Sequence, residues 1–122
     1  MSVQLSDREA KLITEEQGVA PKRFKEQTQD PRTEAVLRSL LDDIRRGEPK
    51  YEQILPSLAS FLRQDLPTIQ ADMKRRGGVK SMVFKGVSPR GSDIYQVTFE
   101  NGNMECRLML ASDGTIILLG FS

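Results

Sequence analysis

Residues 93–121 read DIYQVTFENGNMECRLMLASDGTIILLGF, and the order of side chains in this stretch decides the fold. Apolar and polar residues alternate along most of it, which is the period of a β-strand. Two groups of turn-forming residues interrupt the alternation, at Asn101-Gly102 and at Ser112-Asp113-Gly114. The pattern therefore predicts three successive antiparallel strands, over residues 93–100, 103–111 and 115–121.

The middle hairpin has one preferred register. If Asn101-Gly102 forms the whole turn, Phe99 lies opposite Met104 and the neighbouring pairs follow in antiparallel order. A three-residue turn would shift the pairing by one residue and mix apolar with polar side chains on both faces. We therefore expect the two-residue turn, which gathers the apolar side chains on one face: Tyr95, Val97, Phe99, Met104, Cys106 and Leu108.

Two helices are predicted upstream. Apolar residues recur at helical spacing over residues 31–46, after the capping residue Asp30, and again over residues 56–76. Gly47 ends the first of these helices, and Gly77-Gly78 ends the second. A proline inside the second helix, Pro67, predicts a kink near residues 64–66, or two shorter helices that meet there.

A fold class follows from this order of elements. Residues 79–87 alternate like a strand and complete a set of four. Short turns join these strands, so neighbours in sequence are expected to be neighbours in the sheet. Residues 30–122 are therefore predicted to form an α+β domain, with N-terminal helices packed on a four-stranded antiparallel meander.

The N-terminal residues read as an appendage to that domain. Ser6 and Glu9 have the spacing of a helix-capping box. Gly18, followed closely by Pro21, predicts the end of the helix that begins there. Residues 1–29 are therefore expected to be a partly helical appendage.

The composition excludes several kinds of chemistry. The 122 residues include no His and a single Cys. Without His, one chain cannot form a His-ligated metal site or a Ser-His or Cys-His catalytic pair. One Cys cannot form an intrachain disulfide or a Cys-rich zinc site. We expect no metal and no cofactor, and whether the chain is an enzyme stays open, with a non-catalytic role favoured.

Charge and hydropathy bound the partners and the compartment. Lys and Arg number 18 against 17 Asp and Glu, and both signs are spread along the chain, so we expect no nucleic-acid partner. No run of 18 apolar residues occurs, so we expect no membrane-spanning segment. The N-terminus lacks the apolar core of a signal peptide. This favours a cytoplasmic location for the sequence as written, or a secreted or periplasmic one if a signal was removed.

The last strand has more apolar residues than one core face needs. Ile116, Ile117, Leu118 and Leu119 are consecutive, so both sides of the strand are apolar. A second subunit, the N-terminal segment or a larger parent protein is expected to cover the outer side. The candidate interface residues there are Ile94, Met109, Ile117 and Leu119, with a polar patch that includes Glu105 and Arg107.

A pocket between sheet and helices is the second candidate site. Its candidate residues are Tyr95 and Cys106 on the sheet, with Phe61 and Asp65 on the second predicted helix. The Tyr95 phenol could orient a ligand, and a buried Asp65 could act as a base. For Tyr95 and Cys106 the alternative is core packing, and for Asp65 it is an exposed helix acid. A basic cluster at Lys74–Arg76 and Lys80 is interpreted mainly as a helix end.

Several short segments of residues 31–122 resemble a known family. The chain is similar to small NTF2-like or cystatin-like (SnoaL-like) rolls. It most resembles those that stand alone or form the C-terminal accessory domain of β-lactamase/esterase-type serine hydrolases. The segments that carry the resemblance are Glu34–Arg38, Gly47, Tyr51, Pro56–Ala59, Arg63-Gln64, Leu66-Pro67, Val83–Val87, Asp93–Val97 and Asp113–Ile116.

The resemblance implies a non-catalytic accessory module. The hydrolase relatives keep their catalytic Ser-x-x-Lys motif in another domain, and that motif is absent from this sequence. Domains of this kind often dimerise through the open face of the sheet. Our leading hypothesis is therefore a protein-interaction domain that forms a homodimer through its sheet. The alternative is a roll that binds a small hydrophobic ligand, with weak enzymatic activity.

Overall fold

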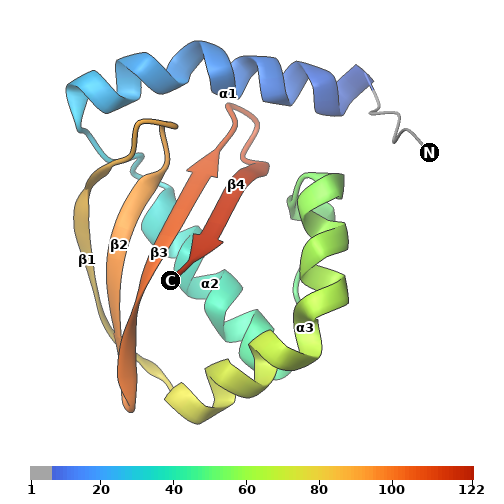
Figure 1. The fold of residues 1–122 in the computed structure, drawn as a ribbon, viewed down its shortest axis with the longest axis vertical. Coiled ribbons are helices and arrows are strands. Elements are labelled where there is room, and N and C mark those ends of the chain that lie inside the picture. Colours follow the sequence, from blue (N-terminus) through green and yellow to red (C-terminus); the bar gives the residue numbers. More distant parts are fainter. Residues whose placement is uncertain (1–6) are drawn as a thin grey trace.

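The computed structural model describes residues 7–122, and it has three helices followed by four strands (Figure 1). A short 3-10 helix, η1, lies between the second and third helices. The elements are α1 (Asp7–Glu26), α2 (Thr33–Arg46), η1 (Tyr51–Gln53), α3 (Pro56–Arg76), β1 (Val79–Val87), β2 (Asp93–Phe99), β3 (Gly102–Leu110) and β4 (Ile116–Phe121).

The sheet is an antiparallel meander with the strands in the order β1-β2-β3-β4. This confirms the predicted α+β fold class, since the helices precede the strands and contact the sheet. The four strands also lie within one residue of their predicted bounds. Strand bounds were readable because glycine and polar turn residues interrupt the alternation at each end.

The predicted register of the β2–β3 hairpin is wrong by two residues. Phe99 pairs with Gly102 instead of Met104, so the turn consists of Glu100 and Asn101. The turn is held from outside, because the amides of Glu100 and Asn101 donate to the carbonyls of Gly78 and Arg76, at 3.0 and 2.8 Å. Gly102 adopts a φ of 117°, which suits glycine at the first position after the turn.

The error of two residues left the faces of the sheet unchanged. Side chains alternate with a period of two, so a shift by two keeps each one on its own side. The six apolar residues assigned to one face are all buried against the helices. From α2, Leu37 and Ile44 are completely buried in the same core.

Helix α2 begins two residues later than predicted. Asp30 does not cap the helix at its first turn. Its carboxylate accepts a hydrogen bond from the Arg32 amide at 2.9 Å, within a turn that precedes Thr33. The end of α2 is as predicted, because Gly47 adopts the left-handed conformation there, with a φ of 78°.

Helix α3 is one continuous helix with Pro67 inside it. Of the two predicted arrangements, this is the kinked helix, and Figure 1 shows α3 changing direction in its middle part. A proline has no amide hydrogen to donate and crowds the preceding turn, which accounts for the bend. The helix begins at Pro56 and is capped by Gly77, as the sequence predicted.

Helix α1 is longer than predicted, because it passes through Gly18 and Pro21 and ends at Glu26. Neither residue ends the helix, because the part of α1 that follows Pro21 is held by contacts with the sheet. The Arg23 guanidinium donates to the buried Asp93 carboxylate and, at 2.8 Å, to the Gly91 carbonyl. The Ser6 capping position lies outside the described residues.

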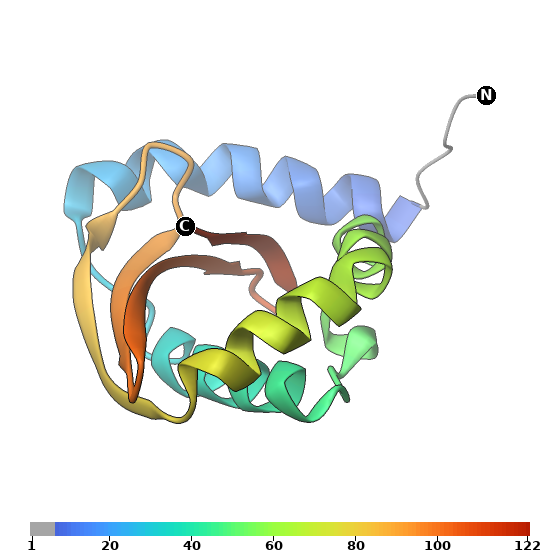
Figure 2. The same cartoon turned by 60° about the horizontal axis from the view of Figure 1, so that its bottom comes forward.

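Helix α1 crosses the outer face of the sheet, opposite α2 and α3 (Figure 2). Leu12 of α1 packs there in a small second core with Leu55, Met109, Ala111 and Ile117. Of the three covers that the sequence left open for β4, the N-terminal segment supplies this one. It covers only the end of the outer face where Met109 and Ile117 lie.

Candidate functional site

The two edges of the sheet differ in how they are protected. Strand β1 carries exposed Lys80 and Lys85, and its pairing with β2 is irregular in two places. Gly86, at the second irregularity, has a φ of 136°. Charged residues and bulges on an edge strand prevent other strands from pairing with it. The β1 edge is therefore guarded.

Strand β4 lacks the charges, and its pairing with β3 is irregular only near its start, between Ile116 and Leu118. Its sequence, IILLGF, contains no charge and no proline. At its start, the Leu55 amide donates to the Ile116 carbonyl at 2.9 Å, and Ile54 forms an isolated bridge with Ile116. Beyond Ile116, β4 is the edge of the described sheet. An apolar, uncharged edge of this kind is a template for pairing with another strand.

The hydrogen bonds to β3 show which backbone groups of β4 point outward. Glu105 and Ser122 exchange both backbone bonds, at 2.8 and 2.9 Å. Because bonded and non-bonded pairs alternate in antiparallel sheets, Leu119 and Phe121 are at non-bonded positions. Their amides and carbonyls are therefore directed away from β3, toward the open edge.

A groove of about 340 Å³ runs along the helix side of this edge, between β4 and α3. Phe61 forms part of its wall and is 67% exposed, the most exposed of the large apolar side chains described. We call this cavity the helix-side groove. Its lining residues are Leu58, Phe61, Leu62, Asp65, Ile69, Leu119, Gly120 and Phe121.

A second groove of about 580 Å³ lies on the other side of the edge. It follows the outer face of the sheet and the loop between β1 and β2, and we call it the outer groove. An ion pair between Glu105 and Arg107, at 2.5 Å, forms its polar part. Its apolar lining includes Leu58, Ile94, Ile117, Leu118 and Leu119.

The predicted interface residues converge on the outer groove, with one exception. The five that line it are Ile94, Glu105, Arg107, Ile117 and Leu119. Met109 is only 2% exposed and packs beneath α1. Leu119 pairs with the core residue Leu108, so its side chain belongs to the helix side of the sheet, and it borders both grooves.

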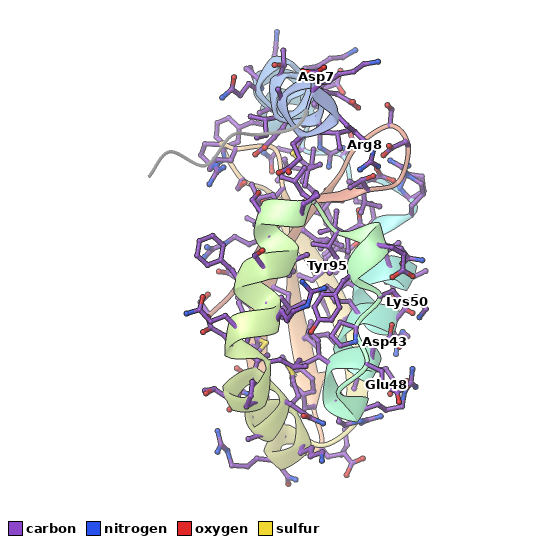
Figure 3. The ribbon with its side chains drawn as sticks, turned by 90° about the vertical axis from the view of Figure 1, so that its right-hand side faces the viewer. Asp7, Arg8, Asp43, Glu48, Lys50 and Tyr95 are labelled. Carbon is purple, nitrogen blue, oxygen red and sulfur yellow. The ribbon has the colours of Figure 1, made fainter. Side chains whose placement is uncertain are left out.

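The predicted pocket residues separate into two pairs. Phe61 and Asp65 line the helix-side groove, where Asp65 is exposed. Tyr95 and Cys106 lie in the core, and Figure 3 shows Tyr95 in the interior, between α2 and α3. The structure therefore does not bring the four side chains together in one cavity.

Burial sets the chemistry of Tyr95 and Cys106. The Tyr95 hydroxyl donates to the Gln29 side chain at 2.7 Å, and burial raises the pKa of Tyr95 to about 12. Burial also raises the pKa of the Cys106 thiol to about 12. A thiol acts as a nucleophile only when deprotonated, so Cys106 is not reactive near neutral pH.

Charged side chains of α2 and α3 pair with one another or with nearby residues of the chain. Asp72 accepts hydrogen bonds from both Arg75 and Arg76, so two members of the predicted basic cluster are paired. Asp43 is buried and accepts from Lys50 at 2.7 Å, and Figure 3 shows the two side by side. Across residues 7–122 no group of three potential metal ligands is present.

Sequence reasoning missed Leu118 and Gly120 as parts of the site. The signal that could have found them is the absence of charge and proline from β4, which marks an open edge. The described helices contain no segment long and apolar enough to span a bilayer.

Comparison of the chain with protein families, curated proteins and solved structures finds no match.

Proposed function

We propose that this chain is a non-catalytic protein-interaction domain that forms a homodimer through the open edge of β4. The observation that carries the proposal is the contrast between the two edges. Strand β1 is guarded by Lys80, Lys85 and two irregularities, whereas β4 is uncharged and pairs regularly with β3 from Leu118 to Phe121. The unguarded edge presents unpaired backbone groups with which a strand of another chain can pair.

Two copies would pair their β4 strands antiparallel about a two-fold axis. The outward amides and carbonyls of Leu119 and Phe121 would then bond across the axis, joining two four-stranded sheets into one. The same contact would cover Phe61 of each copy, since it lines the groove beside the edge. Removal of an exposed phenylalanine from water adds stabilisation to the backbone bonds.

The resemblance to NTF2-like and cystatin-like rolls supports the same proposal. In that reading the chain is an accessory module, like those attached to β-lactamase/esterase-type serine hydrolases, and works by association.

The alternative proposal is that a small hydrophobic ligand binds in the helix-side groove. That groove has the volume of a small-ligand site, an aromatic wall at Phe61 and a polar group at Asp65.

The decisive variants are at Gly120. A Cβ atom added there would meet nothing closer than the Arg107 Cβ at 4.0 Å, so a side chain fits in the free chain. Gly120→Lys puts a charge beside the open edge, and Gly120→Ala adds only a methyl group. Light scattering on a sizing column is expected to give a dimer for the parent and Gly120→Ala, and a monomer for Gly120→Lys.

The exposed phenylalanines supply a second matched pair. Phe61→Ser removes an apolar side chain beside the edge, and Phe24→Ser removes one from α1, where Phe24 is 46% exposed. The dissociation constant of the dimer is expected to rise in Phe61→Ser and to stay unchanged in Phe24→Ser. A parent chain that stays monomeric at all concentrations, or a Gly120→Lys variant that still dimerises, would contradict the proposal. A monomer whose Phe61 signals shift with an apolar ligand would favour the alternative.

A further inference from the structure

A third cavity, of about 490 Å³, lies at the opposite side of the molecule from β4. It is bounded by α2 and by the connection from α3 to β1, which lie side by side in Figure 2. It shares no lining residue with either groove of the β4 edge. We call it the α2 pocket, and its lining is Ala35, Arg38, Ser39, Leu41, Asp42, Arg45, Met73, Gly77, Gly78, Val79 and Phe99.

The lining of the α2 pocket is divided into an apolar base and a polar rim. Leu41, Met73 and Phe99 belong to the main core and are at most 3% exposed, so the base is well packed. The rim is one face of α2, because Arg38 and Arg45 are seven residues, about two helical turns, apart. A cavity with an apolar base and a few converging polar groups is typical of small-ligand sites.

The charges on the rim favour an anion. Asp42 is the acidic residue of the rim, and it already accepts hydrogen bonds from Arg45 and from Arg46. Arg38 is held far less tightly: its ion pair with Glu34 spans 4.0 Å, the longest among the described residues, and both side chains are half exposed. Arg38 can therefore turn to a new carboxylate at little cost.

Gly78 allows the Arg45 side chain to approach the backbone of the connection between α3 and β1. A Cβ atom on Gly78 would lie 3.3 Å from the Arg45 Nη1 and 3.1 Å from Glu100 Oε1. Without that atom, the guanidinium closes the end of the pocket beside Gly78. Arg38 and Ser39 are left as the polar groups at the other end.

We propose that the α2 pocket binds a small amphipathic monocarboxylate. The carboxylate pairs with the Arg38 guanidinium and accepts from the Ser39 hydroxyl, and the hydrocarbon part lies toward Met73 and Phe99. One weakly paired cation matches one negative charge, and the apolar base leaves no place for a second anionic group. The proposal does not depend on self-association, since the β4 edge contributes nothing to this pocket.

The test uses octanoate, with octylammonium as a probe of equal length and opposite charge. Titration of the full chain, followed by backbone amide NMR, is expected to shift residues 35–45, 77–79 and 99 with octanoate only. Arg38→Gln is expected to weaken octanoate binding at least fivefold. Lys25→Gln, which changes the charge equally at an exposed site on α1, is expected to leave binding unchanged.

A blocking variant tests the position independently of charge. Ala35 is exposed at the rim, and Ala35→Phe fills the cavity from a helical position without burying a polar group. It is expected to abolish octanoate binding while the thermal midpoint is kept. Three results would overturn the proposal. They are equal shifts with octanoate and octylammonium, shifts confined to residues of the β4 grooves, and unchanged octanoate binding in Arg38→Gln and Ala35→Phe. Gly120→Lys must bind octanoate as the parent does, which separates this result from that of the dimer test.

Discussion

Tyr95 shows at the scale of one residue how burial changes a group's chemistry. Its ring is 1% exposed and lies 5.8 Å from the Phe84 ring, edge to face. Only its hydroxyl reaches a polar partner, Gln29 of the segment between α1 and α2. The residue is a core side chain with one satisfied hydrogen bond, and it ties this connecting segment to β2.

The raised pKa of Tyr95 predicts a loss of stability at high pH. The pKa of Tyr95 is about 12 in the folded chain against an ordinary value of 10.0, so folding favours the protonated phenol. Its contribution to stability is complete below pH 10 and is lost as the pH rises toward 12. Tyr95→Phe should cost about 0.5–1.5 kcal/mol at pH 8, through the lost hydrogen bond. Urea unfolding at pH 8 and pH 11 should show this difference shrinking, and a constant difference would contradict the explanation.

Cys106 gives a second prediction at this scale. The side chain is completely buried, and its thiol stays protonated well above neutral pH. A colourimetric disulfide reagent at pH 8 should therefore react with the folded chain far more slowly than with the unfolded chain. In guanidinium chloride one thiol per chain should react at once. Rapid reaction of the folded protein would show that the core opens far more readily than this packing implies.

At the scale of elements, polar contacts attach the C-terminal part of α1 and the residues that follow it to the sheet. The Gln27 side-chain amide donates to the Val87 carbonyl and accepts from the Val87 amide, both at 2.9 Å. It thus makes the two hydrogen bonds that the backbone of a neighbouring strand would make to Val87. Arg23 and the Asp30 amide both donate to Asp93, which is completely buried. Asp93 therefore joins the C-terminal part of α1 and the start of the α1–α2 connection to the sheet.

Asp93→Asn should loosen α1 more than the rest of the fold. The amide has no charge to pair with Arg23, so the loss should be about 1–3 kcal/mol. Hydrogen exchange should quicken most in residues 20–26, and less in α2 and β3. Asp65→Asn, a matched change at an exposed acid of α3, should leave both stability and exchange unaltered. Uniform quickening throughout the chain would mean that α1 and the sheet open together.

At the scale of the whole molecule, association and stability are linked. If two copies pair through β4, the dimer is favoured by concentration, and the folded state gains with it. The thermal midpoint of the parent should therefore rise by several degrees when the protein concentration is raised about a hundredfold. This is the size of shift expected for a chain of about this length whose folding is coupled to dimerisation. Gly120→Lys should show one midpoint at every concentration, and scanning calorimetry would detect the difference.

The sequence by itself determined the strands, the helix ends at Gly47 and Gly77, and the side of the sheet on which each strand residue lies. These depend on local chemistry: the alternation has a period of two, and glycine ends helices where the backbone turns left-handed. The α2 pocket was not visible in that pattern. Arg38 and Ser39 are neighbours on α2, but Gly78 lies about forty residues further along the chain, and nothing in this spacing marks the three as one cavity.

The tertiary structure alone decided the hairpin register, the length of α1 and the cover of β4. The carbonyls of Arg76, the last residue of α3, and of Gly78, just beyond it, accept from the β2–β3 turn, so contacts from outside the hairpin fix its pairing. Gly18 and Pro21 would end an isolated helix. The contacts of Arg23 with Asp93 and Gly91 offset the stability that these two residues cost the helix. In both places long-range contacts outweigh local preference, because each local preference amounts to only a few kcal/mol.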